Sequence, residues 1–378
     1  MPLRVGINAV FLEPGMGGLQ TYVLQLIPAL LDEEPDLALT ILANEVGRRL
    51  LEAQPWSSDV SMETPRGTRR GLRAFYELGP LGVTAGRRFD VLHSPALTAP
   101  LRTRCANVVV LADTTWISSP DTGKGQAPTV RLWQAAVPIV ARRADRVIAI
   151  SAASAADVRD HLGVSPGRID VIPLGYEARG REKATSGDVL RERFGLSPGP
   201  IVLNVAMKKV HKNQARLIRA LAQVRRDVPN AQLVLAGART PYEEVLEHEA
   251  REHGVSDAVR ILGYVDDAEL EGLYGAASAF AFPSLNEGFG LPVLEAMARG
   301  VPVVTSNVSA MPEVAGDAAI LVDPTSVDDI ARGIRQVLDP DVGGRLVEKG
   351  LARPGAFTWE NTARLTVRSW RRALTRSS

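Results

Sequence analysis

The sequence predicts an α/β protein built from two doubly wound domains. Apolar, strand-like runs alternate with segments of helical periodicity along almost all of the 378 residues. A polar and charged stretch at 177–188 interrupts this rhythm near the middle, and the alternation begins again at 200. The length suits two domains of ordinary size. We therefore place an amino-terminal domain at 1–178 and a carboxyl-terminal domain at 179–359.

Composition narrows the class of protein. A net charge of +1 argues against nucleic-acid binding as the main activity. Cys105 is the single cysteine, so no internal disulfide can form and a reducing compartment is expected. The first residues lack the pattern of a signal peptide, and no apolar run reaches membrane-spanning length. We expect a cytoplasmic protein.

The first domain is expected to open with a strand, a glycine loop and a helix. Residues 4–12 read as a buried strand, 13–18 as the loop and 19–31 as the helix. This arrangement can hold a phosphate at the start of a helix, and Gly17 and Gly18 would let the backbone approach a ligand. A tight turn without a ligand is an equal alternative. The loop is not GxGxxG, so we predict no nicotinamide site.

A basic and partly aromatic stretch follows the next predicted strand at 37–43. It covers 66–88 and combines Arg66, Arg69, Arg70 and Arg73 with Leu72, Phe75, Tyr76 and Leu78. At helical spacing these residues would form a cationic amphipathic face. A solvated surface is the main alternative to a peripheral contact with a membrane or an acceptor.

Two strands are then expected to carry polar residues at their ends. His93 ends the strand at 89–95, and Asp113 ends the strand within 107–116. Ligands bind at the carboxyl ends of strands in open α/β sheets, so both are candidates. A structural histidine is the alternative for His93.

The first domain closes with further alternating elements. Helical periodicity at 130–144 precedes a strand at 145–151, and a helix at 151–163 begins at a serine and ends at a glycine. A strand and turn at 168–177 complete the domain.

The second domain begins with strand, loop and helix at 201–221, where Lys208 and Lys212 lie in the loop. A strand at 231–238 and a helix at 241–254 follow. Residues 259–278 predict a strand, a turn at Gly263–Tyr264 and a helix capped by Asp266 or Asp267.

The segment 284–300, SLNEGFGLPVLEAMARG, follows a strand-like run and predicts a turn and a helix over Pro292–Arg299. The backbone N–H groups at the helix start form an expected nest for an anion. Glu287 and Glu295 flank it and suit hydroxyl groups better than phosphate. Exposed glutamates on an ordinary strand–turn–helix unit are the alternative. The nest comprises Gly288, Phe289, Gly290 and Leu291.

The chain ends with a strand and loop at 301–316, a strand and helix at 318–338, and a helix at 357–374. Trp359 and Trp370 in this last helix are expected to be core anchors.

The stretch E-GFGLPVLEAMA-GVPVV resembles the E-x7-E signature of retaining glycosyltransferases of the GT-B fold, in particular the group 1 (family 4) nucleotide-sugar enzymes. The resemblance is strong over 200–322 and covers most of the chain. It implies two Rossmann-like domains that face each other across a cleft, with a last helix, 360–378, that packs back on the amino-terminal domain. It also implies a nucleoside diphosphate sugar as co-substrate, retention of configuration, and neither a metal nor another cofactor.

The resemblance assigns roles to particular residues. Lys212 would meet the diphosphate, Glu295 the ribose hydroxyls and Glu287 the donor sugar. Gly263 and Tyr264 would lie near the base, while Gly17 and Gly18 would face the phosphates.

The sequence also departs from the family pattern. Ala112 replaces the usual histidine beside Asp113, and Gln20 replaces an acid. Met207 lies in the segment where many relatives have an arginine. We expect Lys208 to compensate for the arginine and His93 for the histidine. The expected catalytic group is therefore Glu287, Lys212, Asp113 and His93.

The predicted function is transfer of a sugar from a UDP- or GDP-sugar to an acceptor hydroxyl. The acceptor is left open among glycans, lipid-linked sugars and small molecules. A sugar-nucleotide epimerase of the same fold and a non-catalytic nucleotide-sugar binding protein remain as alternatives.

Overall fold

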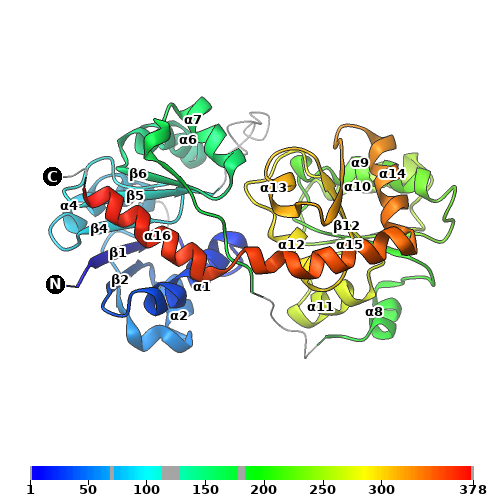
Figure 1. Ribbon diagram of the computed structural model, residues 1–378, viewed down its shortest axis with the longest axis horizontal. Coiled ribbons are helices and arrows are strands. Elements are labelled where there is room, and N and C mark those ends of the chain that lie inside the picture. The colour runs from blue at the N-terminus through cyan, green and yellow to red at the C-terminus, as the bar shows by residue number, and fades with distance from the viewer. Residues whose placement is uncertain (1, 69–71, 113–127, 178–183, 376–378) are drawn as a thin grey trace. The chain divides into compact units, whose positions relative to one another are not determined.

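The computed structural model describes residues 2–68, 72–112, 128–177 and 184–375 (Figure 1). Its contacts divide the chain into two compact units. Unit 1 comprises Met1–Gly175 and Phe357–Ser378, and unit 2 comprises Tyr176–Ala356. The division falls a few residues before each of the boundaries expected from the sequence.

Unit 1 contains a parallel sheet whose described strands follow the order β3-β2-β1-β4-β5-β6-β7. The strands are β1 (Arg4–Ala9), β2 (Ala38–Ala43), β3 (Ser61–Glu63), β4 (Val91–Ser94), β5 (Ala106–Leu111), β6 (Arg146–Ala149) and β7 (Ile169–Val171). The helices are α1 (Gly18–Glu33), α2 (Glu45–Glu52), α3 (Arg73–Leu78), α4 (Pro80–Ala85), α6 (Pro128–Arg143), α7 (Ala152–Leu162) and α16 (Trp359–Leu374).

The central strands of this sheet are buried because helices cover both faces. Every residue of β4, β5 and β6 is buried, which explains why most of these residues are apolar. Figure 1 shows the red helix α16 lying along α1 and the sheet, and contacts of α16 with α1, β5 and β6 agree. Trp359 and Trp370 are buried in α16, which confirms their prediction as core anchors.

Unit 2 contains a second parallel sheet, whose described strands follow the order β10-β9-β8-β11-β12-β13. Its strands are β8 (Ile201–Val205), β9 (Gln232–Ala236), β10 (Val259–Ile261), β11 (Ala279–Phe282), β12 (Val303–Ser306) and β13 (Ala319–Val322). Its helices are α8 (Gly187–Phe194), α9 (Gln214–Val224), α10 (Glu243–Glu252), α11 (Asp267–Ala276), α12 (Leu291–Ala298), α13 (Met311–Ala315), α14 (Val327–Leu338) and α15 (Pro340–Ala352).

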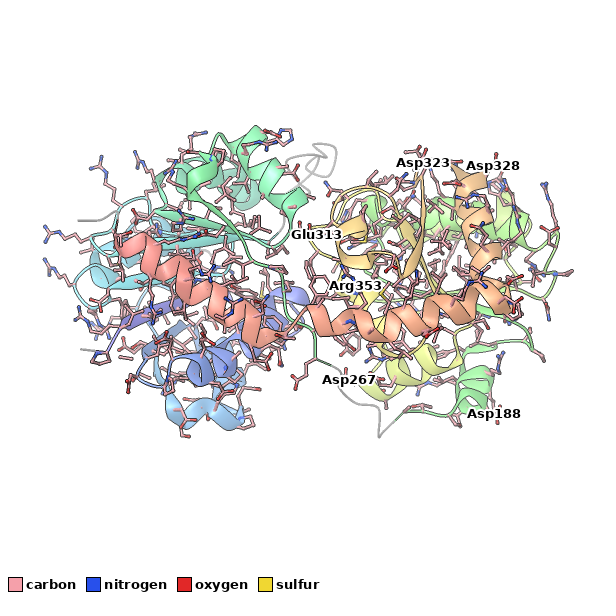
Figure 2. The ribbon with its side chains drawn as sticks, viewed as in Figure 1. Asp188, Asp267, Glu313, Asp323, Asp328 and Arg353 are labelled. Atoms are coloured by element: carbon pink, nitrogen blue, oxygen red, sulfur yellow. The ribbon has the colours of Figure 1, made fainter. Side chains whose placement is uncertain are left out.

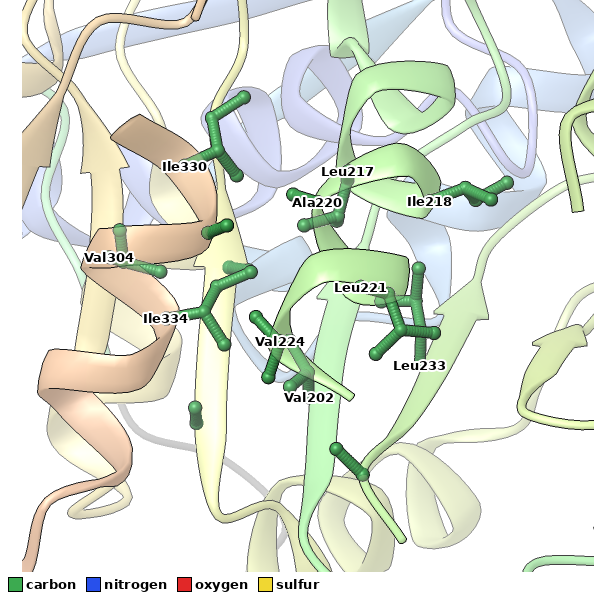
Figure 3. Packing of buried hydrophobic residues seen from close by; sticks show 14 of the residues in the cluster. Val202, Leu217, Ile218, Ala220, Leu221, Val224, Leu233, Val304, Ile330 and Ile334 are labelled. Atoms are coloured by element: carbon green, nitrogen blue, oxygen red, sulfur yellow. The ribbon is translucent and has the colours of Figure 1, made fainter. Parts of the chain in front are cut away.

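The core of unit 2 is formed where α9 and α14 pack side by side on the sheet (Figure 3). Leu217 and Leu221 of α9 and Ile334 of α14 are buried against Val202 and Val304 of the strands. Only one face of each helix contacts the sheet, which explains the amphipathic pattern of both helices.

Each sheet has a point where the strand order reverses. In unit 1 it lies between β1 and β4, and in unit 2 between β8 and β11. Ligands of open α/β sheets bind outside the carboxyl ends of the strands at such points. Three loops of unit 2 therefore lie next to one another: those that follow β8, β11 and β12.

Some local elements differ from the predictions. The helix expected at Pro292–Arg299 spans Leu291–Ala298, one residue earlier. The helical face expected within 66–88 is divided between two short helices in the described part, α3 and α4, because Gly79 ends the first and Pro80 begins the second. Helix α8 begins inside the stretch taken as linker, where Ser186 caps it.

Candidate functional site

The turn before α12 is fixed by its glycine. Gly290 has φ 110°, a backbone angle that favours glycine, and it is the N-cap residue of the helix. A Cβ atom at Gly290 would lie 2.3 Å from the Met311 side chain. The backbone of 288–291 thus curves tightly into the start of α12, as the sequence predicts, with Phe289 buried beneath it.

Lys212 and Glu287 meet at the strand-order reversal of unit 2. Lys212 Nζ donates to Glu287 Oε1 at 2.6 Å, and the two side chains are only 18% and 11% exposed. The ammonium also lies 5.5 Å from the centre of the Phe282 ring. The structure therefore brings together the cation and the acid that the sequence singled out, from loops 75 residues apart.

Backbone contacts hold these two loops together. Leu285 N donates to His211 O at 2.8 Å. Asn213 adopts φ 60° and donates from its buried amide to the carbonyl oxygens of Pro283 and Pro324, at 2.8 and 2.7 Å. Asparagine tolerates this left-handed conformation better than most residues. The Lys212 loop consequently has a defined position against the Glu287 loop.

Ser309, in the loop after β12, clamps the Glu287 turn. Glu287 N donates to Ser309 Oγ at 2.9 Å, and Ser309 Oγ donates to Glu287 O at 2.6 Å. The hydroxyl also lies 2.9 Å from Asn286 Oδ1. Ser309 itself has φ 60°, an uncommon value for a residue with a side chain. No motif in the sequence indicates this contact.

Glu295 lies one turn into α12 and is held by an aromatic hydroxyl. Tyr274 Oη of α11 donates to Glu295 Oε2 at 2.8 Å, and Tyr274 is buried. Burial raises the pKa of Glu295, while the hydrogen bond from Tyr274 opposes that rise. Arg299 lies over the Tyr274 ring, 4.7 Å from its centre, and donates to Tyr176 Oη at 3.0 Å.

Lys208 does not have the position expected of a phosphate ligand. It is fully buried, and its Nζ donates to the backbone carbonyls of Gly237 and Leu262. Burial lowers its pKa to about 8. Lys208 therefore ties together the loops after β9 and β10 in this structure, and we leave it out of the proposed site.

The turn after β10 carries the residues expected near the base. Gly263 accepts a hydrogen bond from Gly237 N at 3.2 Å, and a Cβ at Gly263 would lie 3.1 Å from the Arg239 guanidinium. Tyr264 is 82% exposed. Asp266 caps the next helix through a capping box with Glu269, which settles the alternative between Asp266 and Asp267.

In unit 1 the glycine loop lies after β1, as predicted. Gly17 has φ 56° and precedes α1, whose first residue is Gly18. Gln20, which replaces the acid of the resembled pattern, accepts from Gly15 N at 2.9 Å and so shapes the loop. A Cβ at Gly17 or Gly18 would meet nothing within 4 Å, so the loop surface is open at both positions.

His93 is enclosed, which contradicts the expectation that it compensates for the missing histidine. The ring is 0% exposed; Trp370 Nε1 donates to Nδ1 at 3.2 Å, and Nε2 lies 3.3 Å from Tyr22 Oη. Burial lowers the pKa of His93 to about 3, so the neutral ring donates from Nε2 to Tyr22. His93 joins β4, α1 and α16. The other candidate of this sheet, Asp113, lies outside the described residues.

The basic stretch 66–88 is partly neutralised where the structure describes it. Arg73 contacts Glu77 at 3.2 Å, and Arg88 pairs with Glu63. Phe75 is nevertheless 72% exposed. Arg69 and Arg70 lie outside the described residues.

Across the ranges that the structure describes, no helix is both long and apolar enough to cross a membrane. The same ranges contain no group of three or more His, Cys, Asp or Glu side chains placed to hold a metal ion.

Comparison with known proteins identifies the family. The family model for glycosyl transferases group 1 matches residues 189–347, and the model for Glycosyltransferase Family 4 matches residues 16–179. Together they cover both units. The chain belongs to the group 1 glycosyltransferases.

Curated relatives of this group 1 family member include mannosyltransferases. The O-antigen chain mannosyltransferase B of Escherichia coli is 45% identical over 141 residues, 37% of each chain. The MMP alpha-(1->4)-mannosyltransferase of Mycolicibacterium hassiacum is 32% identical over 259 residues, 66% of this chain and 60% of the relative. The matched regions thus span less than two thirds of these relatives' lengths.

Solved structures establish the GT-B fold for this group 1 glycosyltransferase. Sucrose-phosphate synthase from Thermosynechococcus elongatus is similar with a TM-score of 0.74 and 21% identity, over all of both chains. Anabaena HepE in complex with UDP-glucose is similar with a TM-score of 0.73 and 20% identity, over 97% of this chain and 100% of HepE. The predicted fold class is confirmed.

Proposed function

We propose that the protein transfers a sugar from a nucleoside diphosphate sugar to an acceptor hydroxyl, with retention at the anomeric carbon. The observation that carries this proposal is the Lys212–Glu287 contact at the strand-order reversal of unit 2, next to the start of α12. At this edge of the sheet, the cation and the helix N–H groups suit the diphosphate of such a donor. The two acids suit the hydroxyl groups of its sugar and ribose.

The proposed chemistry concerns the leaving diphosphate. The bond between the anomeric carbon and the β-phosphate oxygen breaks, and the diphosphate keeps the electron pair. The acceptor oxygen bonds to the same carbon, and its proton is released with the diphosphate. Lys212 and the backbone amides of 288–291 would stabilise the developing charge, and one such donor can contribute about 3 kcal/mol. We propose no metal in this step.

We assign the two glutamates separate roles. Glu295 would accept hydrogen bonds from the ribose hydroxyls through its second oxygen, since Tyr274 occupies Oε2. Glu287 would accept from hydroxyls of the transferred sugar. The names of the curated relatives support mannose as that sugar and a carbohydrate as the acceptor.

The test is donor consumption by the whole protein, measured as nucleotide release from UDP- and GDP-linked glucose and mannose, with and without saccharide acceptors. We expect release that depends on an acceptor. Conversion of the donor to an isomeric sugar nucleotide without an acceptor would instead support an epimerase.

The two glutamates predict different losses. Glu295→Ala should weaken nucleotide binding about tenfold or more, because a partly buried carboxylate that we propose to bind the ribose hydroxyls is removed. Glu287→Ala should reduce the turnover number of sugar transfer without weakening nucleotide binding. Binding isotherms and initial rates of both variants check the assignment, and the opposite pattern would exchange the two roles.

A second candidate is a protein that binds nucleotide sugars without turnover. The enclosure of His93, together with Ala112 and Met207, favours it, since no alternative histidine is offered to a donor at these positions. Donor binding without release of nucleotide under any acceptor would support this candidate.

A further inference from the structure

We infer that Glu287 makes the site discriminate between its substrate and its product, favouring the intact nucleoside diphosphate sugar over the free nucleoside diphosphate. The inference rests on the proposed function, because it takes Lys212 as the partner of the diphosphate. It adds a role for Glu287 that contact with the sugar alone does not require.

The contact between the two side chains gives the first reason. Glu287 Oε1 lies 2.6 Å from Lys212 Nζ, and both side chains are largely buried. Any phosphate oxygen that reaches this ammonium must come within a few ångströms of the carboxylate. Water screens charges weakly at so enclosed a position, so the carboxylate repels an added negative charge there.

The turn that carries Glu287 is held in place, which gives the second reason. Ser309 bonds both the N–H and the carbonyl of Glu287, at 2.9 and 2.6 Å. Ser309 adopts φ 60° in this arrangement, a conformation that is unfavourable for a residue with a Cβ. Gly290 packs on Met311 on the other side of the turn. The backbone of Glu287 therefore cannot move far from Lys212 when an anion binds.

The chemistry of the two ligands supplies the difference. In the nucleoside diphosphate sugar, the β-phosphate is esterified and the sugar hydroxyls can donate hydrogen bonds to Glu287. In the product, a terminal phosphate oxygen takes the place of the sugar, and a terminal phosphate loses a second proton with a pKa near 6. At neutral pH the product thus brings extra negative charge toward the carboxylate and no hydroxyl to satisfy it.

The consequence concerns product release. The carboxylate of Glu287 repels the product but does not weaken binding of the substrate. It therefore lowers product inhibition. Release of the product limits turnover in many enzymes, so such discrimination also supports a high turnover number.

The test compares binding of donor and product to Glu287→Gln, which removes the charge and keeps the size of the side chain. Isothermal titration is run with the UDP/UDP-glucose and GDP/GDP-mannose pairs, and the pair that binds the unmodified protein is used. We expect the Kd of the nucleoside diphosphate to fall roughly fivefold or more, because a repulsive charge is removed. The Kd of the sugar nucleotide should stay the same or rise.

Three further variants make the result specific. Glu287→Ala is a second neutral variant, so the comparison survives if one of the two does not fold. Glu287→Asp keeps the charge and should keep the unmodified preference for the sugar nucleotide. Glu244→Gln makes the same change of charge at an exposed position of α10 and should leave both Kd values unchanged.

An unchanged ratio of the two Kd values in both neutral variants would overturn the inference. So would weaker binding of the nucleoside diphosphate in both, since Glu287 would then orient Lys212 toward the phosphate. Failure of the proposed function looks different: the unmodified protein would bind neither member of any pair and release no nucleotide.

Discussion

Single contacts between residues that are distant in the sequence determine how the side chains of the candidate site are oriented. Glu295 is an example, because Tyr274 Oη donates to one of its oxygens at 2.8 Å and leaves the other available. Arg299 lies over the same tyrosine ring and pairs with Glu271, so the tyrosine is itself held in place. Tyr274 is therefore a positioning residue for Glu295 in the proposed site.

Tyr274→Phe should weaken nucleoside binding several-fold, because the carboxylate of Glu295 loses the hydrogen bond that holds it in place. Burial already raises the pKa of Glu295, and the variant removes a hydrogen bond that lowers it. The pKa of Glu295 should rise further, so nucleoside binding should be lost at a higher pH than in the unmodified protein. Titrations from pH 5 to 8 measure this, and an equal loss of affinity at every pH would indicate a merely structural tyrosine.

Residue type and spacing indicated some site residues and missed others. The E-x7-E pattern singled out Glu287 and Glu295, and the resemblance to group 1 glycosyltransferases singled out Lys212. The contacts of Ser309 with Glu287 and of Tyr274 with Glu295 could not be found in this way, because no motif links the residues of either pair. Lys208 was misjudged because a lysine in a loop is usually exposed, whereas here Lys208 is buried and its neighbour Lys209 is exposed.

At the scale of elements, caps and glycines made the helices predictable. Ser151 begins α7 and Gly163, at φ 66°, ends it, as the sequence indicates. Short elements such as β3 and α4 were not predictable, since three to six residues give no measurable periodicity. The polar link from Trp370 through His93 to Tyr22, which joins α16 to β4 and α1, was also invisible in the sequence.

That link predicts a pH dependence of folding stability. The folded protein lowers the pKa of His93 from 6.5 to about 3, so between these values the unfolded chain binds a proton that the folded protein does not. The contribution of His93 to the free energy of unfolding is therefore complete above pH 6.5. It is lost as the pH falls toward 3, by about 1.4 kcal/mol per pH unit.

His93→Gln should remove this dependence while an amide still offers a donor and an acceptor to Tyr22 and Trp370. Urea unfolding of both proteins between pH 4 and 7 gives the difference in the free energy of unfolding. We expect the unmodified protein to lose stability relative to the variant as the pH falls. Donor turnover at neutral pH should be retained in the variant. A difference that is constant with pH would contradict a neutral, buried His93.

At the scale of the whole molecule, the sequence predicts two doubly wound α/β units. The residues that the structure describes form two parallel sheets with one strand-order reversal in each. The alternation of apolar strands and amphipathic helices makes this predictable from a single sequence. The residues proposed to bind the nucleotide and its diphosphate, Lys212, Glu287 and Glu295, all belong to unit 2. The acceptor is not predictable in the same way, because no motif in unit 1 specifies its chemistry.

The most direct test of the central claim is the affinity of the Lys212→Ala variant for a nucleoside diphosphate and for the corresponding nucleoside, measured by isothermal titration. If the ammonium binds the diphosphate, its removal should weaken binding of the nucleoside diphosphate about tenfold or more, because a charge-assisted contact is lost. Binding of the bare nucleoside should stay within about twofold of the unmodified protein. Equal losses for the two ligands would contradict the account.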